Sequence, residues 1–93
     1  MQTFLVDREL TGISMADLHG LTAACLRQSA RMREAGDRIY YLGSTFLPAE
    51  GRCLCLFEAK DASVVTALNQ TAGLPVQRIV PAMTLATAAV SAV

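Results

Sequence analysis

The sequence predicts a single α+β domain whose strands and helices follow the order βαββαβ. Two segments have the apolar spacing of amphipathic helices, and four shorter segments are rich in residues that favour strands. The chain has 93 residues, which is enough for one domain but not for two. We therefore expect one domain over residues 1–85, followed by a C-terminal tail over residues 86–93.

The first strand and the first helix are predicted in the N-terminal part of the chain. Residues 3–8 are rich in β-forming side chains and predict a strand. Ser14 is a good helix N-cap, and Asp17, three residues later, supports this assignment. Apolar residues then recur at helical spacing until Gly36, a residue that favours a helix end. We expect this helix to span about residues 14–35.

A β-hairpin is predicted to follow the helix. Residues 39–47 form its first strand, residues 48–51 its turn and residues 52–59 its second strand. The second strand is apolar at every position from Cys53 to Phe57. Such a run is typical of a strand buried on both faces, so we expect it to lie inside the sheet.

The second helix and the last strand complete the pattern. Asp61 is a suitable N-cap for the helix, Gly73 ends it, and Pro75 prevents its continuation. Residues 76–80 then predict a short strand, and Pro81 follows it directly. Because proline is confined to the edges and ends of sheets, we expect this strand at an edge.

The order of the elements predicts the arrangement of the sheet. Right-handed crossovers give an antiparallel sheet of order 4-1-3-2, with both helices on one face, which is the ferredoxin-like sandwich. Hydrophobic residues make up 53% of the chain and charged residues only 17%, so charges are too few to cover a small domain. We therefore expect a second chain on the open face, giving a homodimer with an α/β barrel-like assembly.

Charge and hydropathy argue against several classes of partner. Eight basic and eight acidic residues give a net charge of zero, and no basic stripe with interleaved aromatic residues predicts nucleic-acid binding. A neutral chain is not attracted to an anionic membrane surface. No apolar run approaches the roughly 20 residues of a membrane span, and the N-terminal residues do not predict a signal peptide. We therefore expect a cytoplasmic protein whose three cysteines are reduced thiols.

Two cysteines and a histidine are the candidate metal ligands. Cys53 and Cys55 are expected on the same face of one strand, because side chains alternate along it, and two thiolates at that spacing can share a soft metal ion. Packing of both thiols in the core is the alternative. His19 is the only histidine, and its helical phase places it at the boundary of the apolar stripe or in solvent. A metal site would therefore draw on Cys53, Cys55 and His19.

Charged and aromatic residues near the open face are candidates for binding a small molecule. Arg8 and Arg78 are suited to hold an anionic group, and Glu58 ends the third strand. Tyr40 and Tyr41 fall on opposite faces of the second strand, and Tyr41 is our candidate for the open side. Ordinary ion pairs at the rim of the sheet are the alternative interpretation of the charged residues.

Four short motifs occur in order along the chain: Phe4-Leu5-Val6-Asp7-Arg8-Glu9-Leu10 with Gly12, Tyr41-Leu42-Gly43-Ser44, Cys55 with Phe57 and Ala59, and Ala72-Gly73-Leu74-Pro75. Over about residues 3–80 they resemble a family of small bacterial nickel-binding proteins, long known as a domain of unknown function. The resemblance implies a ferredoxin-like fold, a dimer and nickel or another divalent metal as cofactor. Many members carry histidine where this chain has Gly43 and Leu68, so Cys55 is the metal donor left among the matching positions.

Three functions stay open at this point. The first is a non-catalytic metal-binding dimer, and the second is a small-molecule-binding protein or cofactor-free enzyme that uses the open face. The third is an interaction module whose function is the dimer interface itself. No motif supports catalysis, because the serines lack a base at a meaningful spacing and the glycines form no phosphate-binding loop.

Overall fold

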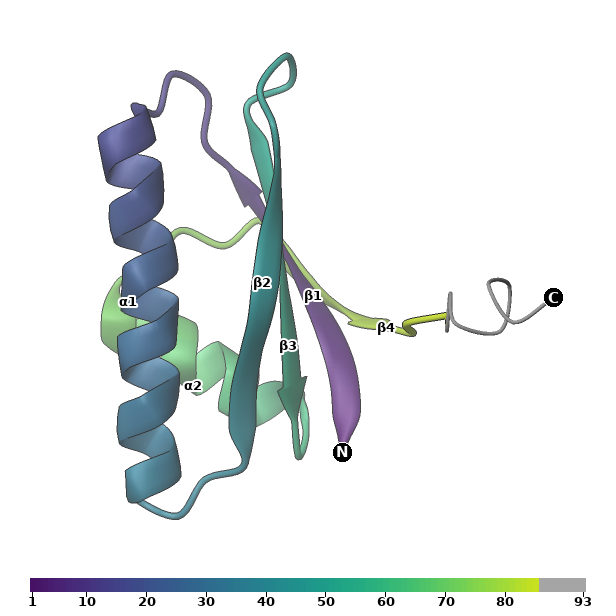
Figure 1. Ribbon diagram of the computed structural model, residues 1–93. Helices are drawn as coiled ribbons and strands as arrows, with labels where there is room; N and C mark the ends of the chain where they lie inside the picture. The colour runs from purple at the N-terminus through teal and green to yellow at the C-terminus, as the bar shows by residue number, and fades with distance from the viewer. Residues whose placement is uncertain (86–93) are drawn as a thin grey trace, which may run out of the picture.

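The computed structural model describes residues 1–85 and confirms the predicted βαββαβ order (Figure 1). The elements are β1 (Gln2–Glu9), α1 (Met15–Glu34), β2 (Ile39–Leu47), β3 (Arg52–Ala59), α2 (Ala62–Ala72) and β4 (Arg78–Ala82). The expected C-terminal tail, residues 86–93, lies outside the described residues.

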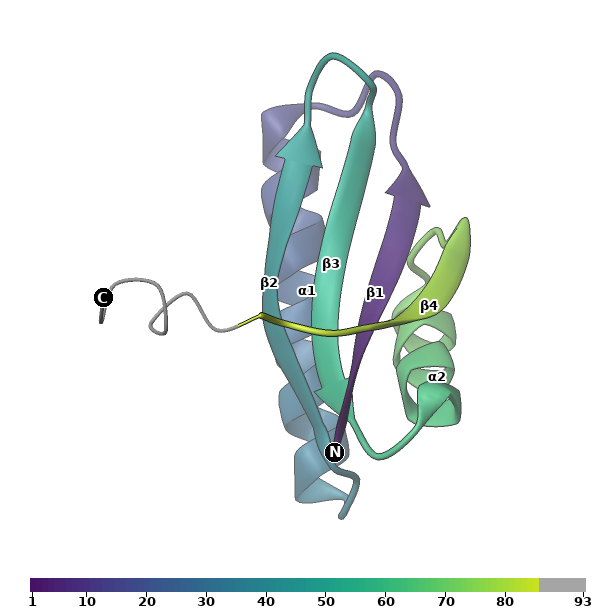
Figure 2. The same cartoon turned by 90° about the vertical axis from the view of Figure 1, so that its right-hand side faces the viewer.

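The four strands form one antiparallel sheet in the order β2-β3-β1-β4, which is the predicted order read from the other edge. Both helices lie on the same side of this sheet, as Figure 1 shows. Within residues 1–85 the opposite face carries no helix; it is turned towards the viewer in Figure 2, where residues 83–85 after β4 cross in front of the other strands. We call these two surfaces the helix-covered face and the open face.

The helices begin and end at the residues that the caps predict. The Ser14 hydroxyl accepts a hydrogen bond from the N–H of Asp17 at 3.0 Å, and the Asp61 carboxylate accepts one from Val64 at 3.3 Å. Gly73 ends α2 in the left-handed conformation, with φ 66°, which glycine adopts without steric cost. Neither helix within residues 1–85 is long and apolar enough to cross a membrane.

Side chains of β3 alternate between the two faces of the sheet. Cys53, Cys55 and Phe57 are completely buried on the helix-covered face, whereas Leu54 and Leu56 on the open face stay partly exposed. The prediction that both faces of this strand are buried is therefore wrong for a single chain, because the helices cover only one of them. The core lies between the sheet and the helices, where α1 and α2 contribute Leu18, Leu21, Cys25, Val65 and Leu68.

The strand β4 lies at an edge, as predicted, but begins and ends two residues later than expected. The N–H of Gln77 donates to the carbonyl of Asp7 at 2.8 Å, so the chain joins β1 only at that point. Pro81 then lies within β4, opposite Phe4, rather than after it. An edge strand tolerates proline because one of its sides needs no hydrogen-bond donor.

The strand β2 forms the other edge and contains a β-bulge. Tyr41 pairs with Phe57 and Gly43 pairs with Leu56, so Leu42 is an extra residue without a partner in β3. Gly43 has a φ of 132°, a conformation that side chains disfavour. As a result Leu42 lies on the open face with 51% of its surface exposed.

Candidate functional site

Arg8 is the largest fully buried side chain among residues 1–85. It lies on the helix-covered face with Phe4 and Val6, because residues two and four positions apart on a strand share a face. The expectation that Arg8 lies on the open face is therefore wrong. The charged neighbours Asp7 and Glu9 favour a position at the rim of the sheet. Side chains alternate along β1, however, so the Arg8 side chain points to the face opposite that of Asp7 and Glu9.

The guanidinium of Arg8 donates hydrogen bonds to two sulfur atoms and one carbonyl. Its Nε lies 3.3 Å from Cys55 Sγ, and its Nη2 lies 3.7 Å from Cys25 Sγ. Its Nη1 donates to the carbonyl of Pro75 at 2.9 Å, in the segment between α2 and β4. No carboxylate touches this cation within the described residues, so a thiolate is the available counter-charge.

Cys55 is the centre of this cluster. Ser44 Oγ donates to Cys55 Sγ at 2.9 Å, and Cys53 Sγ lies 3.8 Å from the same sulfur. The hydroxyl of Tyr41 contacts Ser44 Oγ. We call Arg8, Cys25, Ser44, Cys53 and Cys55 the thiol cluster.

Tyr41 lies beside the thiol cluster and not on the open face, so its expected position is wrong. Its ring packs against Phe57, with the ring centroids 5.3 Å apart. Tyr41 shares the helix-covered face with Ile39, which is completely buried two residues earlier. Burial raises the pKa of Tyr41, so this residue keeps its proton at neutral pH.

One thiol of the cluster is far more acidic than the others. Hydrogen bonds from Cys25, Ser44 and Arg8 lower the pKa of Cys55 to about 5, against the effect of burial. Interaction with the neighbouring Cys55 and burial raise the pKa of Cys25, and burial raises the pKa of Cys53 to about 11. The cluster therefore holds one negative charge at neutral pH, on Cys55 beside Arg8.

The candidate metal ligands do not come together. Cys53 and Cys55 share the helix-covered face as expected, but both are completely buried, whereas His19 is exposed on α1. No group of three or more His, Cys, Asp or Glu side chains within residues 1–85 is arranged to hold a metal ion. Two further positions, Gly43 and Leu68, are those where many members of the resembling family carry histidine. In this chain Gly43 has no side chain, and Leu68 is fully buried in the core.

A second polar cluster lies on the open face. Asp7 is only 3% exposed and forms ion pairs with Arg52 at 2.6 Å and with Arg78 at 3.3 Å. The hydrogen bond from Arg52 lowers the pKa of Asp7, and its other oxygen, Oδ1, has no partner among the described residues. Arg78 therefore lies near the open face as expected, but there it binds a carboxylate of its own chain.

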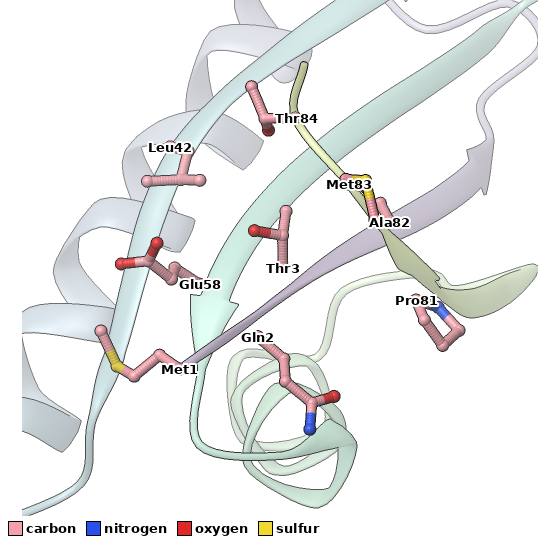
Figure 3. A pocket seen from close by; sticks show the side chains of 9 residues that line it. All are labelled: Met1, Gln2, Thr3, Leu42, Glu58, Pro81, Ala82, Met83 and Thr84. Atoms are coloured by element: carbon pink, nitrogen blue, oxygen red, sulfur yellow. The ribbon is translucent and has the colours of Figure 1, made fainter. Parts of the chain in front are cut away.

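The open face is hollowed beside Glu58. A groove of about 620 Å³ runs between the bulge of β2 and the chain after β4. Figure 3 shows Glu58 and Thr3 in this groove, with Leu42 and Met83 on its walls. Of the four open-face candidates, Glu58 lines the groove, while Arg78 does not, and Arg8 and Tyr41 lie on the other side of the sheet.

Sequence reasoning missed the contact between Arg8, Cys25 and Cys55. Cys25 lies in the apolar stripe of α1 with Leu18 and Leu21, and helical spacing alone predicts only that it packs in the core. The available signal was the phase of β1, since Phe4 and Val6 assign Arg8 to the same covered face as Cys55.

Comparisons with known proteins support this fold. A family model described as "Nickel responsive protein SCO4226-like" matches residues 4–81. The crystal structure of SCO4226 from Streptomyces coelicolor A3(2) is similar with a TM-score of 0.74 and 24% sequence identity, covering 90% of this chain and 99% of that chain. At this identity the likeness shows a shared fold. No curated protein matches the sequence.

Proposed function

Because this chain belongs to the family of SCO4226-like nickel-responsive proteins, we propose that it is a small, non-catalytic, metal-responsive protein that works as a homodimer. The apolar surface of the open face carries the proposal. Leu42 and Met83 are 51% and 82% exposed there, and Leu54 and Leu56 of β3 are covered only in part. Exposed apolar side chains of this kind are typical of a face that meets another chain.

A second copy of the chain is the partner that fits this face. The chain has no net charge, so two copies approach without electrostatic repulsion. The commonest closed assembly is a two-fold dimer, in which the same patch of both chains is buried. Cytoplasmic conditions fit this protein, since its three cysteines are free thiols.

Substitution of Leu42 by glutamate tests the interface. Leu42→Glu places two charges in the proposed interface, so light scattering during gel filtration should show a shift from dimer to monomer. Leu26→Glu is the matched control, because Leu26 is 58% exposed on α1, on the other side of the sheet. A wild-type monomer, or a Leu42→Glu variant as dimeric as Leu26→Glu, contradicts the proposal.

A closed nickel centre does not fit the described residues of one chain. Nickel(II) prefers imidazole or mixed nitrogen, oxygen and sulfur ligands, and no three His, Cys, Asp or Glu side chains within residues 1–85 are arranged to hold a metal ion. The positive charge of Arg8 lies 3.3 Å from Cys55 Sγ and opposes a divalent cation at this thiolate. His19 is exposed on α1, so its imidazole is accessible to a metal ion in solution. We therefore propose weak, exchangeable metal contact at His19 and none at Cys53 or Cys55.

Metal analysis of untagged protein tests this assignment. Nickel titration of the wild type should give weak binding that His19→Ala removes, with no absorption from a nickel–thiolate bond. Cys53→Ser and Cys55→Ser should bind as the wild type does. Stoichiometric nickel that is retained through dialysis and lost in Cys55→Ser contradicts the assignment.

The groove beside Glu58 favours a second candidate function, a small-molecule-binding or cofactor-free catalytic dimer. A second chain over the open face would enclose this volume of about 620 Å³ and turn it into a pocket with one carboxylate. A crystal structure of the dimer tests this function. An enclosed cavity with Glu58 in its wall supports it, and two sheets packed together without a cavity exclude it.

A further inference from the structure

We propose that Cys55 is a site of oxidation by a hydroperoxide, and that Cys25 completes the reaction by forming a disulfide bond with it. The proposal goes beyond the metal-responsive function, because it uses the buried thiols that do not fit a nickel centre.

Charge around Cys55 favours the thiolate, which is the reactive form of cysteine. The buried Arg8 guanidinium needs an anion, and Nε donates to Cys55 Sγ at 3.3 Å. Ser44 donates to the same sulfur at 2.9 Å. The titratable neighbours Tyr41 and Cys53 have raised pKa values, so they stay neutral and leave the negative charge on Cys55.

Cys25 is placed to react with an oxidised Cys55. It approaches from α1, across the core, and its sulfur lies 3.7 Å from Nη2 of the Arg8 guanidinium. Nε and Nη2 form one edge of the planar guanidinium, so the two sulfurs lie side by side along that edge. Cys53 is a poorer partner, because a disulfide between residues i and i+2 of one strand has unfavourable geometry.

A hydroperoxide reaches Cys55 through the edge of the sheet. Cys55 itself is completely buried, but the Ser44 side chain that contacts it is exposed. β2 is an edge strand, and no other strand within residues 1–85 pairs with it on the side away from β3. The path proposed for a small oxidant therefore runs past Ser44, and it requires the Ser44 side chain to turn away from Cys55.

The chemistry balances with the hydroperoxide as oxidant. The Cys55 thiolate attacks the terminal peroxide oxygen, the O–O bond breaks, and the leaving alkoxide or hydroxide takes a proton from water. The product is a sulfenic acid on Cys55. The Cys25 sulfur then attacks this sulfur, the S–O bond breaks, and the oxygen leaves as water with the thiol proton of Cys25. The two thiols lose two electrons, which reduce an alkyl hydroperoxide to one alcohol and one water, or hydrogen peroxide to two waters.

Oxidation also changes the environment of Arg8. The disulfide carries no charge, so the buried guanidinium loses its anion and keeps only the carbonyl of Pro75 at 2.9 Å. Pro75 lies in the segment that leads from α2 to β4. The oxidation state of Cys55 is thereby coupled to the segment that positions the edge strand.

Peptide mapping of the reduced full-length protein tests the proposal. Hydrogen peroxide is added at pH 6 and at pH 8, free thiols are alkylated, and peptides are analysed without reduction. We expect a link between the peptides of Cys25 and Cys55, in the wild type and equally in the control variant Cys53→Ser. In Cys25→Ser, dimedone should label a sulfenic acid on Cys55.

The pH dependence of the rate separates this reaction from unspecific oxidation. Oxidation of Cys55 should change by less than about threefold between pH 8 and pH 6, whereas an ordinary peptide thiol slows roughly a hundredfold. The wild type alone therefore decides the question, even if a variant fails to fold. An unmodified Cys55, a link to Cys53 or to a second chain, or the steep pH dependence of an ordinary thiol overturns the proposal.

Discussion

Asp7 and Arg8 are adjacent on β1, yet their buried side chains lie in two separate polar clusters on opposite faces of the sheet. Asp7 accepts hydrogen bonds from Arg52 and Arg78 on the open face. Arg8 donates to Cys55 under the helices. Each residue therefore has a partner of opposite charge that is distant in the sequence, and the two clusters can be tested independently.

Removal of Arg8 should destabilise the fold strongly. Arg8→Leu leaves the Cys55 thiolate buried without a cation, and breaking a buried ion pair costs about 3–5 kcal/mol in the free energy of unfolding. The double variant Arg8→Leu with Cys55→Ala replaces both charges and should recover a large part of this loss. Urea unfolding of both single variants, the double variant and the wild type measures the coupling. Additive effects would show that the two side chains do not form a pair.

The free energy of unfolding should rise with pH because of Cys55. Its pKa is lowered to about 5 in the folded chain, against about 8.5 for an unfolded thiol. A lowered pKa stabilises the fold fully above about pH 8.5, and this contribution is lost as the pH falls through about 5. Each unit by which the folded pKa lies below the unfolded pKa adds about 1.4 kcal/mol to the free energy of unfolding. Urea unfolding between pH 5 and pH 9 measures it. Cys55→Ser should abolish this dependence and Cys53→Ser should keep it, and equal slopes in the two variants would rule it out.

Asp7 should stabilise the fold at neutral pH and lose this effect in acid. The pKa of Asp7 is lowered by its hydrogen bond from Arg52, so its contribution is present above the unfolded value of about 3.9 and disappears as the pH falls below it. Asp7→Asn should lower the free energy of unfolding by about 1–2 kcal/mol at pH 7. Asp37→Asn is the control, because that carboxylate is exposed. If the difference between Asp7→Asn and the wild type stays constant down to pH 2, this ion-pair explanation is wrong.

Two glycines should respond in opposite directions to alanine. Gly51 has a φ of 64°, and an added Cβ would lie 2.8 Å from Thr11 Cα, so Gly51→Ala should cost about 1–3 kcal/mol. Gly20 lies in α1 with nothing within 4 Å of an added Cβ, so Gly20→Ala should stabilise the helix by about 0.5–1 kcal/mol. Thermal unfolding of the two variants gives the comparison. A Gly51→Ala variant as stable as Gly20→Ala would contradict the described turn.

The sequence predicts the bounds of β2 and β3 because their β-forming runs are separated by a turn with proline and glycine. It misplaces β4 because Pro81 predicts the end of a strand, although proline is also allowed inside an edge strand. The pairing of Gln77 with Asp7, which fixes where β4 begins, is a contact between distant segments that no local pattern contains.

The candidate site was harder to predict than the fold, because alternation along a strand defines two faces without saying which one the helices cover. Arg8 and Tyr41 were assigned to the wrong face for this reason. The fully apolar neighbours two positions away, Val6 and Ile39, carry the missing information, since both are completely buried. Cys25 was missed because only the tertiary structure brings α1 against the thiols of β3.

The two edges of the sheet limit how copies of this chain can associate. At one edge the bulge at Leu42 interrupts the ladder of β2, and at the other Pro81 removes a donor from β4. Neither edge presents an unbroken row of backbone donors and acceptors to a strand from another molecule. Growth of a continuous intermolecular sheet, the first step towards fibres, is therefore opposed at both ends. A protein with an exposed apolar face can remain dispersed in this way. Two copies then associate through their open faces, and a two-fold dimer leaves no open face for a third copy.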